Sequence, residues 1–273
     1  MNFWIKQYAK NSLKPTTWDS YNTQIQKHII PALGHIMLKN LKTGDLQVLY
    51  NQKLETGRAD GKKGGLSPKT VRYIHTVIHA ALEQAVKERI IGFNPARVAV
   101  PPRKVKKEKR VFGSAEIGKF LKYAKSTKYY AAYLLVMATG MRRGELLALR
   151  REKDIDLQDG KVTISRNLVR TNAGLIFQEP KTENSIRTVG IPGFIIKELQ
   201  AHFERQDEKK NVLGSSFKDN DLAFCADDGS PLDPRSFTRF FERLVKKAGL
   251  PKIAFHDLSY PNLNKIQTFL IKS

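Results

Sequence analysis

Apolar residues in the first hundred positions recur every three or four residues, which is the spacing of one face of a helix. Trp18, Tyr21 and Ile25 follow this spacing and predict a first helix. A threonine side chain can accept the free N–H groups of a first turn, so either Thr16 or Thr17 is expected to be the N-cap. The first segment is therefore predicted to be helical.

Two further helices are expected in this first segment. One starts near residues 43–45, and the glycine- and lysine-rich stretch 58–65 after it predicts a loop. Ser67 as N-cap and Pro68 at the first helical position begin the other helix, which residues 94–95 (Asn-Pro) are expected to end. Its apolar face comprises Val71, Ile74, Ile78, Ala81, Leu82 and Ala85. Together these elements predict a small all-helical domain.

The pattern changes after residue 110. Ser114 is expected to cap a helix, the apolar run 130–139 to form a buried helix that ends at Gly140, and residues 144–149 to form a short amphipathic helix. The remaining elements are strands over 161–170, 174–179 and 185–191, then helices over 193–209 and 234–248. The predicted fold class is mainly α with a small antiparallel sheet.

Composition narrows the functional classes. The 273 residues hold 48 Lys and Arg against 26 Asp and Glu, a net charge of +22, so a polyanionic partner is expected and nucleic acid is the default. A membrane surface and the ribosome are the competing polyanions. The single cysteine, Cys225, excludes a disulfide framework and is interpreted as a buried strand residue. Residues 101–111 predict a basic linker between two domains, and no apolar run is long enough to span a membrane.

Three short segments hold candidate chemistry, and each has an ordinary structural explanation when taken alone. Arg142 follows the buried helix and can present a guanidinium to a phosphate, although most arginines at such turns are simply solvated. Lys181 lies on a turn between two predicted strands, where a solvated lysine is common. His256 has apolar neighbours, and such a histidine is more often part of a core than a catalyst.

In this order, however, the segments resemble the tyrosine recombinases, the phage integrase family of site-specific DNA recombinases. The family patterns TGxRxxEL, PKTxxSxR on a hairpin, and HDL match residues 139–146, 180–187 and 256–258. The first segment resembles the helical core-binding, SAM-like domain of integrases from Gram-positive phages and conjugative elements, in stretches 13–17, 28–34, 66–71 and 94–95. The resemblance implies a core DNA-binding domain over 1–100, a basic linker over 101–111, an α+β catalytic domain over 112–258 and a tail over 259–273.

The resemblance also implies a mechanism that uses no metal and no cofactor. A tyrosine attacks a DNA phosphodiester and forms a 3′-phosphotyrosine, while two arginines clamp the phosphate. Arg142 matches the first arginine, and Glu145 matches the acidic neighbour that orients it. Lys181 matches the lysine that protonates the leaving 5′-oxygen, and His256 matches the histidine that contacts the phosphate and assists proton transfer.

The match stops abruptly at residue 258. Ser259 stands where the family has its second arginine, and residues 260–273 match neither the nucleophilic tyrosine nor the C-terminal helix through which family members form tetramers. Tyr260 is only four residues from His256 and is interpreted as an ordinary tail residue. We hypothesise a frameshift or aberrant junction, which sequencing the gene past codon 258 would test. The catalytic domain is then expected to be C-terminally incomplete and less stable than its relatives, and no arm-site-binding module is expected ahead of it.

Candidate DNA contacts lie at helix starts, where side chains and free N–H groups can meet phosphates, and along the linker. They are Lys14, Thr16, Thr17, Lys69, Thr70, Arg72, Tyr73, His75, Arg103, Lys104, Lys106 and Lys107. His75 and His79 have metal-compatible spacing, but no carboxylate or cysteine partner is expected nearby, so no metal site is predicted.

Three functions stay open on the sequence: a recombinase of double-stranded DNA, a DNA-binding remnant that occupies recombination half-sites without cutting, and, on charge alone, an RNA or ribosome binder. Of these, binding without recombination is favoured. The expected location is the bacterial cytoplasm, in association with the nucleoid.

Overall fold

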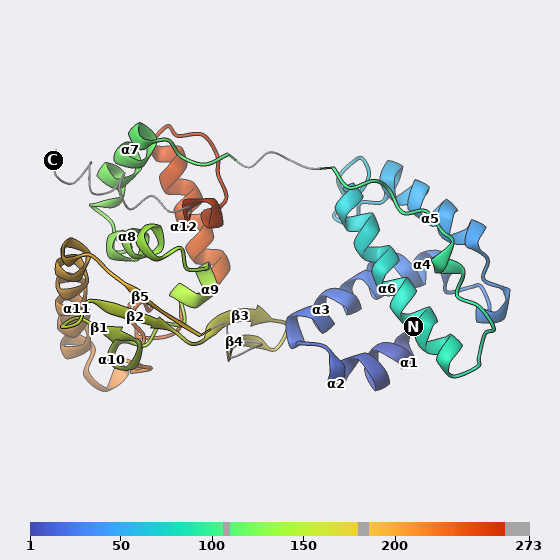
Figure 1. Cartoon of the computed structure of the whole chain (residues 1–273), viewed down its shortest axis with the longest axis horizontal. Coiled ribbons are helices and arrows are strands. Elements are labelled where there is room, and N and C mark those ends of the chain that lie inside the picture. Colours follow the sequence, from blue (N-terminus) through green and yellow to red (C-terminus); the bar gives the residue numbers. More distant parts are fainter. Residues whose placement is uncertain (106–109, 180–185, 260–273) are drawn as a thin grey trace. The chain divides into compact units, whose positions relative to one another are not determined.

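The structure is a computed structural model that describes residues 1–105, 110–179 and 186–259 (Figure 1). The chain forms two compact units, Met1–Glu108 and Lys109–Ser273, so the division falls within the basic stretch 101–111. The first unit is helical, and the second combines helices with short antiparallel strands. This confirms the predicted fold class. In the described part of the chain, no helix is both long and apolar enough to cross a bilayer.

Unit 1 is built around α6, whose apolar face is buried along its whole length. Ile74 and Ile78 of this helix share a core with Ile25, Leu46 and Tyr50, all of which are fully buried. The helices are α1 (Asn2–Trp4), η1 (Ile5–Ala9), α2 (Lys10–Ser12), α3 (Pro15–Gln24), η2 (Ile25–Ile29), α4 (Ile30–Leu33), η3 (Leu38–Asn40), α5 (Thr43–Thr56), α6 (Pro68–Lys87) and η4 (Pro95–Arg97).

Two helix ends in unit 1 differ from expectation. Thr16 and Thr17 are not caps, because Pro15 occupies the first helical position and moves the N-cap back to Lys14. The predicted cap of α6 is confirmed, since the Ser67 hydroxyl accepts the N–H of Thr70 at 3.2 Å. That helix ends at Lys87, before the predicted stop; Asn94 instead caps η4, where its side chain accepts the N–H of Ala96 at 2.9 Å.

One buried histidine should make the stability of unit 1 depend on pH. His28 on η2 is buried, its Nδ1 has no hydrogen-bond partner among the described residues, and burial together with Lys53 and Lys27 lowers its pKa. The folded state therefore binds fewer protons than the unfolded state, whose histidine has a pKa of about 6.5. Above that pH His28 is neutral in both states and does not change the free energy of unfolding. As the pH falls below it, protonation of the unfolded state lowers the free energy of unfolding.

We therefore expect the urea midpoint of unit 1 to fall between pH 7.5 and pH 5.5, and to fall less in a His28→Leu variant. Trp4 and Trp18 are the two tryptophans of the chain, and both lie in unit 1, so their fluorescence reports this unit selectively. Equal pH slopes in the wild type and the variant would show that His28 is not the group responsible.

Unit 2 is built around α8 (Tyr130–Thr139), in which every residue from 130 to 138 is buried. Gly140 ends this helix with a φ of +66°, as its sequence position predicts. The other helices are α7 (Ser114–Ala124), α9 (Arg143–Leu146), α10 (Arg151–Asp154), α11 (Gly193–Leu213), η6 (Gly214–Ser216), α12 (Pro234–Lys247) and η7 (Phe255–Ser259). Figure 1 shows α11 beside the strands, and this helix also packs against α8; α7 and α12 lie together near α8.

The strands form two small antiparallel sheets rather than one. The first has the order β1 (Ile155–Asp156), β2 (Lys161–Ile164), β5 (Arg187–Gly190), and the second pairs β3 (Asn167–Thr171) with β4 (Gly174–Gln178). The predicted strand 161–170 therefore breaks between β2 and β3. At the break, Arg166 turns inward: its Nε donates to the carbonyl of Ala148 at 2.6 Å, and its guanidinium lies 4.5 Å from the centre of the Phe177 ring.

Three smaller expectations for unit 2 were wrong. Ser114 begins α7 rather than capping it, because Glu116 accepts the N–H of Gly113, the residue before. Helix α9 is shorter than predicted, since the chain beyond it pairs with another segment: the carbonyl of Leu149 accepts the N–H of Ala223 at 2.9 Å. Cys225 is half-buried in an isolated bridge, and burial raises the pKa of its thiol.

Candidate phosphate-binding site and DNA-binding surfaces

The turn between α8 and α9 positions Arg142. Gly140 reverses the chain in the left-handed region, and Arg142 then takes an extended backbone as the N-cap of α9. Helix α9 approaches β3 very closely: a Cβ on Gly144 would lie 2.7 Å from the backbone oxygen of Leu168, as well as 2.0 Å from Oδ1 of Asn167. Only glycine fits this contact, so the sequence Thr-Gly-Met-Arg-Arg-Gly fixes both ends of the turn that presents the arginine.

Glu145 is the centre of the site. Its side chain is only 10 % exposed, and its two carboxylate oxygens accept four hydrogen bonds. Two come from Arg142, through the backbone N–H at 2.8 Å and Nη1 at 2.8 Å, and two from Arg187, through Nη2 at 2.7 Å and Nη1 at 3.3 Å. Burial alone would raise the pKa of Glu145, but the bonds from Arg187 and Arg142 outweigh it and hold the pKa below its ordinary value.

Glu145 therefore contacts both the backbone and the side chain of Arg142. The Arg142 side chain is 80 % exposed, so Glu145 anchors the guanidinium at one N–H and leaves its other donors open to solvent. Arg187, at the start of β5, belongs to the PKTxxSxR motif, and the sequence alone predicts no role for it. Its only signal was its place in the PKTxxSxR pattern, because its partner is 42 residues away.

His256 lies on η7 and is exposed, so it is not the core histidine of the ordinary explanation. Its neighbours Phe255 and Leu258 are buried instead, and Phe255 packs edge-on against Phe241 with ring centres 5.3 Å apart. Lys181 lies outside the described residues. The strands that flank it, β4 and β5, belong to different sheets in the described structure, so they do not form the expected hairpin with each other.

A basic face that the sequence reading missed lies on α12. Exposed cations recur along this helix, and within the described ranges none of them forms an ion pair: Arg235, Arg239, Arg243, Lys246 and Lys247. Arg143 joins α9 to this helix, since its Nη1 donates to Oγ1 of Thr238 at 2.6 Å. The Nε of Arg143 is buried without a partner among the described residues, and burial lowers the pKa of its guanidinium.

The predicted DNA contacts of unit 1 fall into two groups. Arg72, Tyr73 and His75 on α6 have partners within the unit: Arg72 donates to the carbonyl of Pro102 at 3.0 Å, Tyr73 packs edge-on against Tyr21, and Nδ1 of His75 lies 2.9 Å from the hydroxyl of Tyr50. The others are likewise exposed or partly exposed, and of these the Thr70 hydroxyl pairs with that of Ser67 at 2.9 Å: Lys14, Thr16, Thr17, Lys69, Thr70, Arg103 and Lys104. Lys106 and Lys107 lie outside the described residues.

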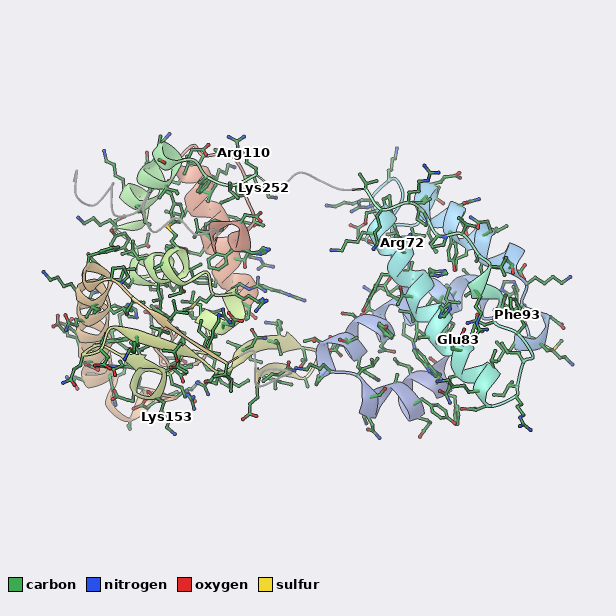
Figure 2. The ribbon with its side chains drawn as sticks, viewed as in Figure 1. Arg72, Glu83, Phe93, Arg110, Lys153 and Lys252 are labelled. Carbon is green, nitrogen blue, oxygen red and sulfur yellow. The ribbon has the colours of Figure 1, made fainter. Side chains whose placement is uncertain are left out.

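The expectation that no carboxylate lies near His79 was wrong. Glu83, labelled on α6 in Figure 2, lies 3.5 Å from Nε2 of His79. Glu83 is already occupied by Arg97, which donates two bonds at 2.7 Å, and by Asn94, and these bonds lower its pKa to about 2. Among the described residues, no three His, Cys, Asp or Glu side chains are placed to bind a metal ion.

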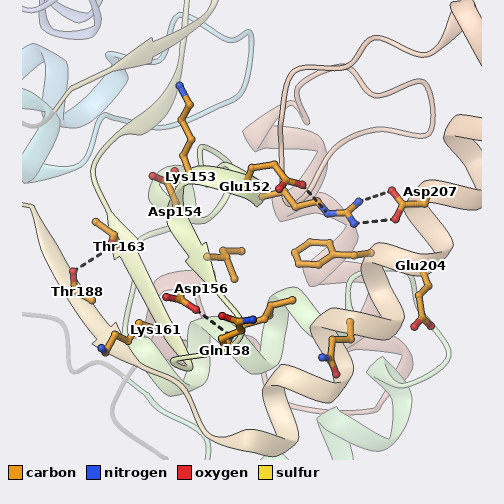
Figure 3. Close-up of a pocket in the computed structure, with 15 residues that line it drawn as sticks. Glu152, Lys153, Asp154, Asp156, Gln158, Lys161, Thr163, Thr188, Glu204 and Asp207 are labelled. Carbon is orange, nitrogen blue, oxygen red and sulfur yellow. Dashed lines mark hydrogen bonds and ion pairs between the residues drawn. The ribbon is translucent and has the colours of Figure 1, made fainter.

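A separate pocket of about 860 Å³ lies between α10, the first sheet and α11 (Figure 3). Arg151 crosses it to pair with both carboxylate oxygens of Asp207, at 2.5 and 2.9 Å, and its guanidinium lies 4.7 Å from the centre of the Phe203 ring. The pocket is lined by neither Arg142 nor Glu145. Arg151, its one lining arginine, is paired with Asp207 and Glu152, so the pocket offers no open guanidinium like that of Arg142.

Comparison with known proteins decides the family. The model of the phage integrase family matches residues 110–259, and that of the phage integrase N-terminal SAM-like domain matches residues 1–54. The chain belongs to the phage integrase family. The first match spans more than half of the sequence and includes Arg142, Glu145, Arg187 and His256.

Proteins named as tyrosine recombinases or integrases are similar to this chain along most of its length. It is 27 % identical to a tyrosine recombinase XerC-like protein of Caldanaerobacter subterraneus, over 97 % of this chain and 71 % of the relative. It is 28 % identical to the ICEBs1 integrase of Bacillus subtilis, over 92 % of this chain and 66 % of that integrase. The fold is similar to that of the Tn1549 transposon integrase in complex with transposon right end DNA. The TM-score is 0.76 at 21 % identity, and the match covers 94 % of this chain and 83 % of that integrase.

Proposed function

We propose that this integrase binds double-stranded DNA at the recombination half-sites of a phage or mobile element, with Arg142 directed at a scissile phosphate. The observation that supports this most is the Arg142–Glu145–Arg187 arrangement, in which one buried carboxylate anchors an open guanidinium. An exposed, always charged guanidinium with several free donors suits a phosphate in geometry and in charge. Similar integrases have been solved on DNA, including a lambda integrase tetramer on a Holliday junction.

We further propose that the chain as it stands binds without exchanging strands. Ser259 occupies the position of the second clamping arginine, and a serine hydroxyl cannot neutralise developing charge on a phosphate. Lys181 and His256 are proposed as the proton donor and the phosphate contact, in the roles of the matching family positions. The alternative of an active recombinase makes a different prediction, because it requires a covalent link between a tyrosine and DNA.

A trapping assay separates these proposals. The protein is mixed with a nicked duplex from the ends of its own element, and the mixture is run on a native gel and on a denaturing gel. A native shift that is stronger than with scrambled DNA or RNA, without a denaturant-resistant adduct, supports binding alone. An adduct that disappears in a Tyr260→Phe variant would instead identify an active nucleophile. Equal shifts with half-site DNA and RNA would favour the generic binder.

The basic face of α12 and the exposed residues of unit 1 are proposed as the surfaces that contact the DNA backbone. Each phosphate contact releases counterions, so affinity should fall steeply with salt. We expect Arg239→Gln and Arg243→Gln each to weaken binding and to reduce the slope of log affinity against log salt by about 1. Arg205→Gln on α11 removes one exposed arginine from the same unit and is the matched control. Identical slopes for control and α12 variants would exclude α12 from the interface.

A further inference from the structure

We propose that Arg187 is a second guanidinium of the phosphate site and contacts the same DNA phosphate as Arg142. This inference rests on the proposed function, because it takes DNA as the source of the phosphate. It starts from the shared carboxylate: Arg142 arrives from the turn after α8 and Arg187 from the start of β5, and both donate to Oε1 and Oε2 of Glu145. Two segments far apart in sequence thus converge on one point.

The charges at this point do not balance. Glu145 supplies one negative charge to two guanidiniums, and among the described residues neither arginine forms an ion pair with any other carboxylate. Arginine stays protonated in proteins, so the cluster has a net charge of +1. The two oxygens of Glu145 already accept four hydrogen bonds, which is all that a carboxylate accommodates. The remaining N–H donors of both arginines therefore need acceptors from outside the cluster.

The geometry suits one phosphate. Nη1 of Arg142 and Nη1 of Arg187 lie 2.8 and 3.3 Å from the same Oε1 atom, so these nitrogens are at most about 6 Å apart. A phosphodiester has two non-bridging oxygens and can accept hydrogen bonds from donors on both sides. The Arg187 side chain is 35 % exposed, so it is held by Glu145 without being closed off from solvent. The second arginine is thus already oriented before an anion arrives.

A different role would be purely indirect: Arg187 holds Glu145, and Glu145 holds Arg142. The two roles differ once Glu145 is neutralised. In a Glu145→Gln background, an Arg187 that acts only through the carboxylate has nothing left to do, whereas an Arg187 that contacts phosphate still contributes a charge and hydrogen bonds. A double-mutant cycle therefore separates contact from positioning.

The experiment measures binding of the full chain to the nicked half-site duplex by fluorescence anisotropy across a salt series. Arg187→Gln should weaken binding about tenfold in both the wild-type and the Glu145→Gln backgrounds, and should reduce the salt slope by about 1. Arg187→Lys keeps the charge, so it should retain the slope and lose only part of the affinity. Arg151→Gln is the matched control, because Arg151 is also a partly exposed arginine of unit 2 that is held by carboxylates, those of Asp207 and Glu152.

Each outcome decides the question. If Arg187→Gln has no effect in the Glu145→Gln background, Arg187 is a positioning residue and the proposal is overturned. If Arg187→Gln behaves like Arg151→Gln while the wild type binds the half-site, the proposal fails and the proposed function stands. If the wild type does not prefer half-site DNA, the proposed function itself fails, and this inference fails with it. Should Arg187→Gln not fold, retention of the salt slope by Arg187→Lys supports contact, and a slope reduced by 1 overturns it.

Discussion

Replacing Glu145 by alanine is expected to lower the free energy of unfolding of unit 2 by about 3 kcal/mol. The carboxylate accepts four hydrogen bonds from a position that is 10 % exposed, and one of them satisfies the backbone N–H at the start of α9. Its removal leaves the guanidinium of Arg187 partly buried next to that of Arg142, with no carboxylate between them. Repulsion and lost hydrogen bonds then act in the same direction, which is why the expected loss exceeds that of a surface ion pair.

Hydrogen exchange of the α8 and α9 amides measures this loss directly, since both helices belong to unit 2. The fluorescence of Trp4 and Trp18 provides an internal control, because both lie in unit 1 and their unfolding midpoint should not move. Glu145→Gln keeps the shape of the side chain and an acceptor oxygen, so it should cost about half as much. A loss below about 0.5 kcal/mol for alanine would show that the carboxylate behaves as an exposed one.

Local signals in the sequence were sufficient to place a helix end wherever two of them coincided. The nine apolar residues 130–138 predicted the burial of α8, and Gly140 predicted its last residue, because an apolar run gives the helix and a left-handed glycine gives its end. Ser67 and Pro68 fixed the start of α6 in the same way. The end of α6 was misplaced because Asn94-Pro95 is a true break signal that serves the next turn, η4.

The strand pattern shows where such signals stop being sufficient. Alternation continues from β2 into β3, and nothing in residues 161–170 indicates that the two halves pair with different partners. The break is set by tertiary contacts of Arg166, which reach Ala148 and Phe177. The same limit applies to the site. Arg142 and Glu145 are three residues apart and predictable from one motif, whereas Arg187 joins them only after the sheet has formed.

Substitutions at Tyr133 should have the second large effect on the stability of unit 2. The ring is expected to stabilise this unit, whereas the hydroxyl is expected to destabilise it. The residue is fully buried on α8, and its ring centre lies 5.2 Å from that of Phe120 and 6.4 Å from that of Phe255. Tyr133→Ala removes the ring from this aromatic cluster and should cost unit 2 about 4 kcal/mol. Because Phe255 precedes His256, we also expect faster hydrogen exchange along η7 in this variant.

Tyr133→Phe is the matched comparison, and it should stabilise unit 2 by about 1 kcal/mol. The hydroxyl of Tyr133 is buried with no hydrogen-bond partner among the described residues, and burial raises its pKa, so the fold gains nothing from the oxygen while losing its hydration. Denaturant unfolding followed by far-ultraviolet circular dichroism, with the tryptophan signal used to separate unit 1, measures both variants. If Tyr133→Phe destabilised unit 2 by 1 kcal/mol or more, the hydroxyl would have to bond a partner, and the aromatic cluster beneath η7 would be held by a polar contact as well as by packing.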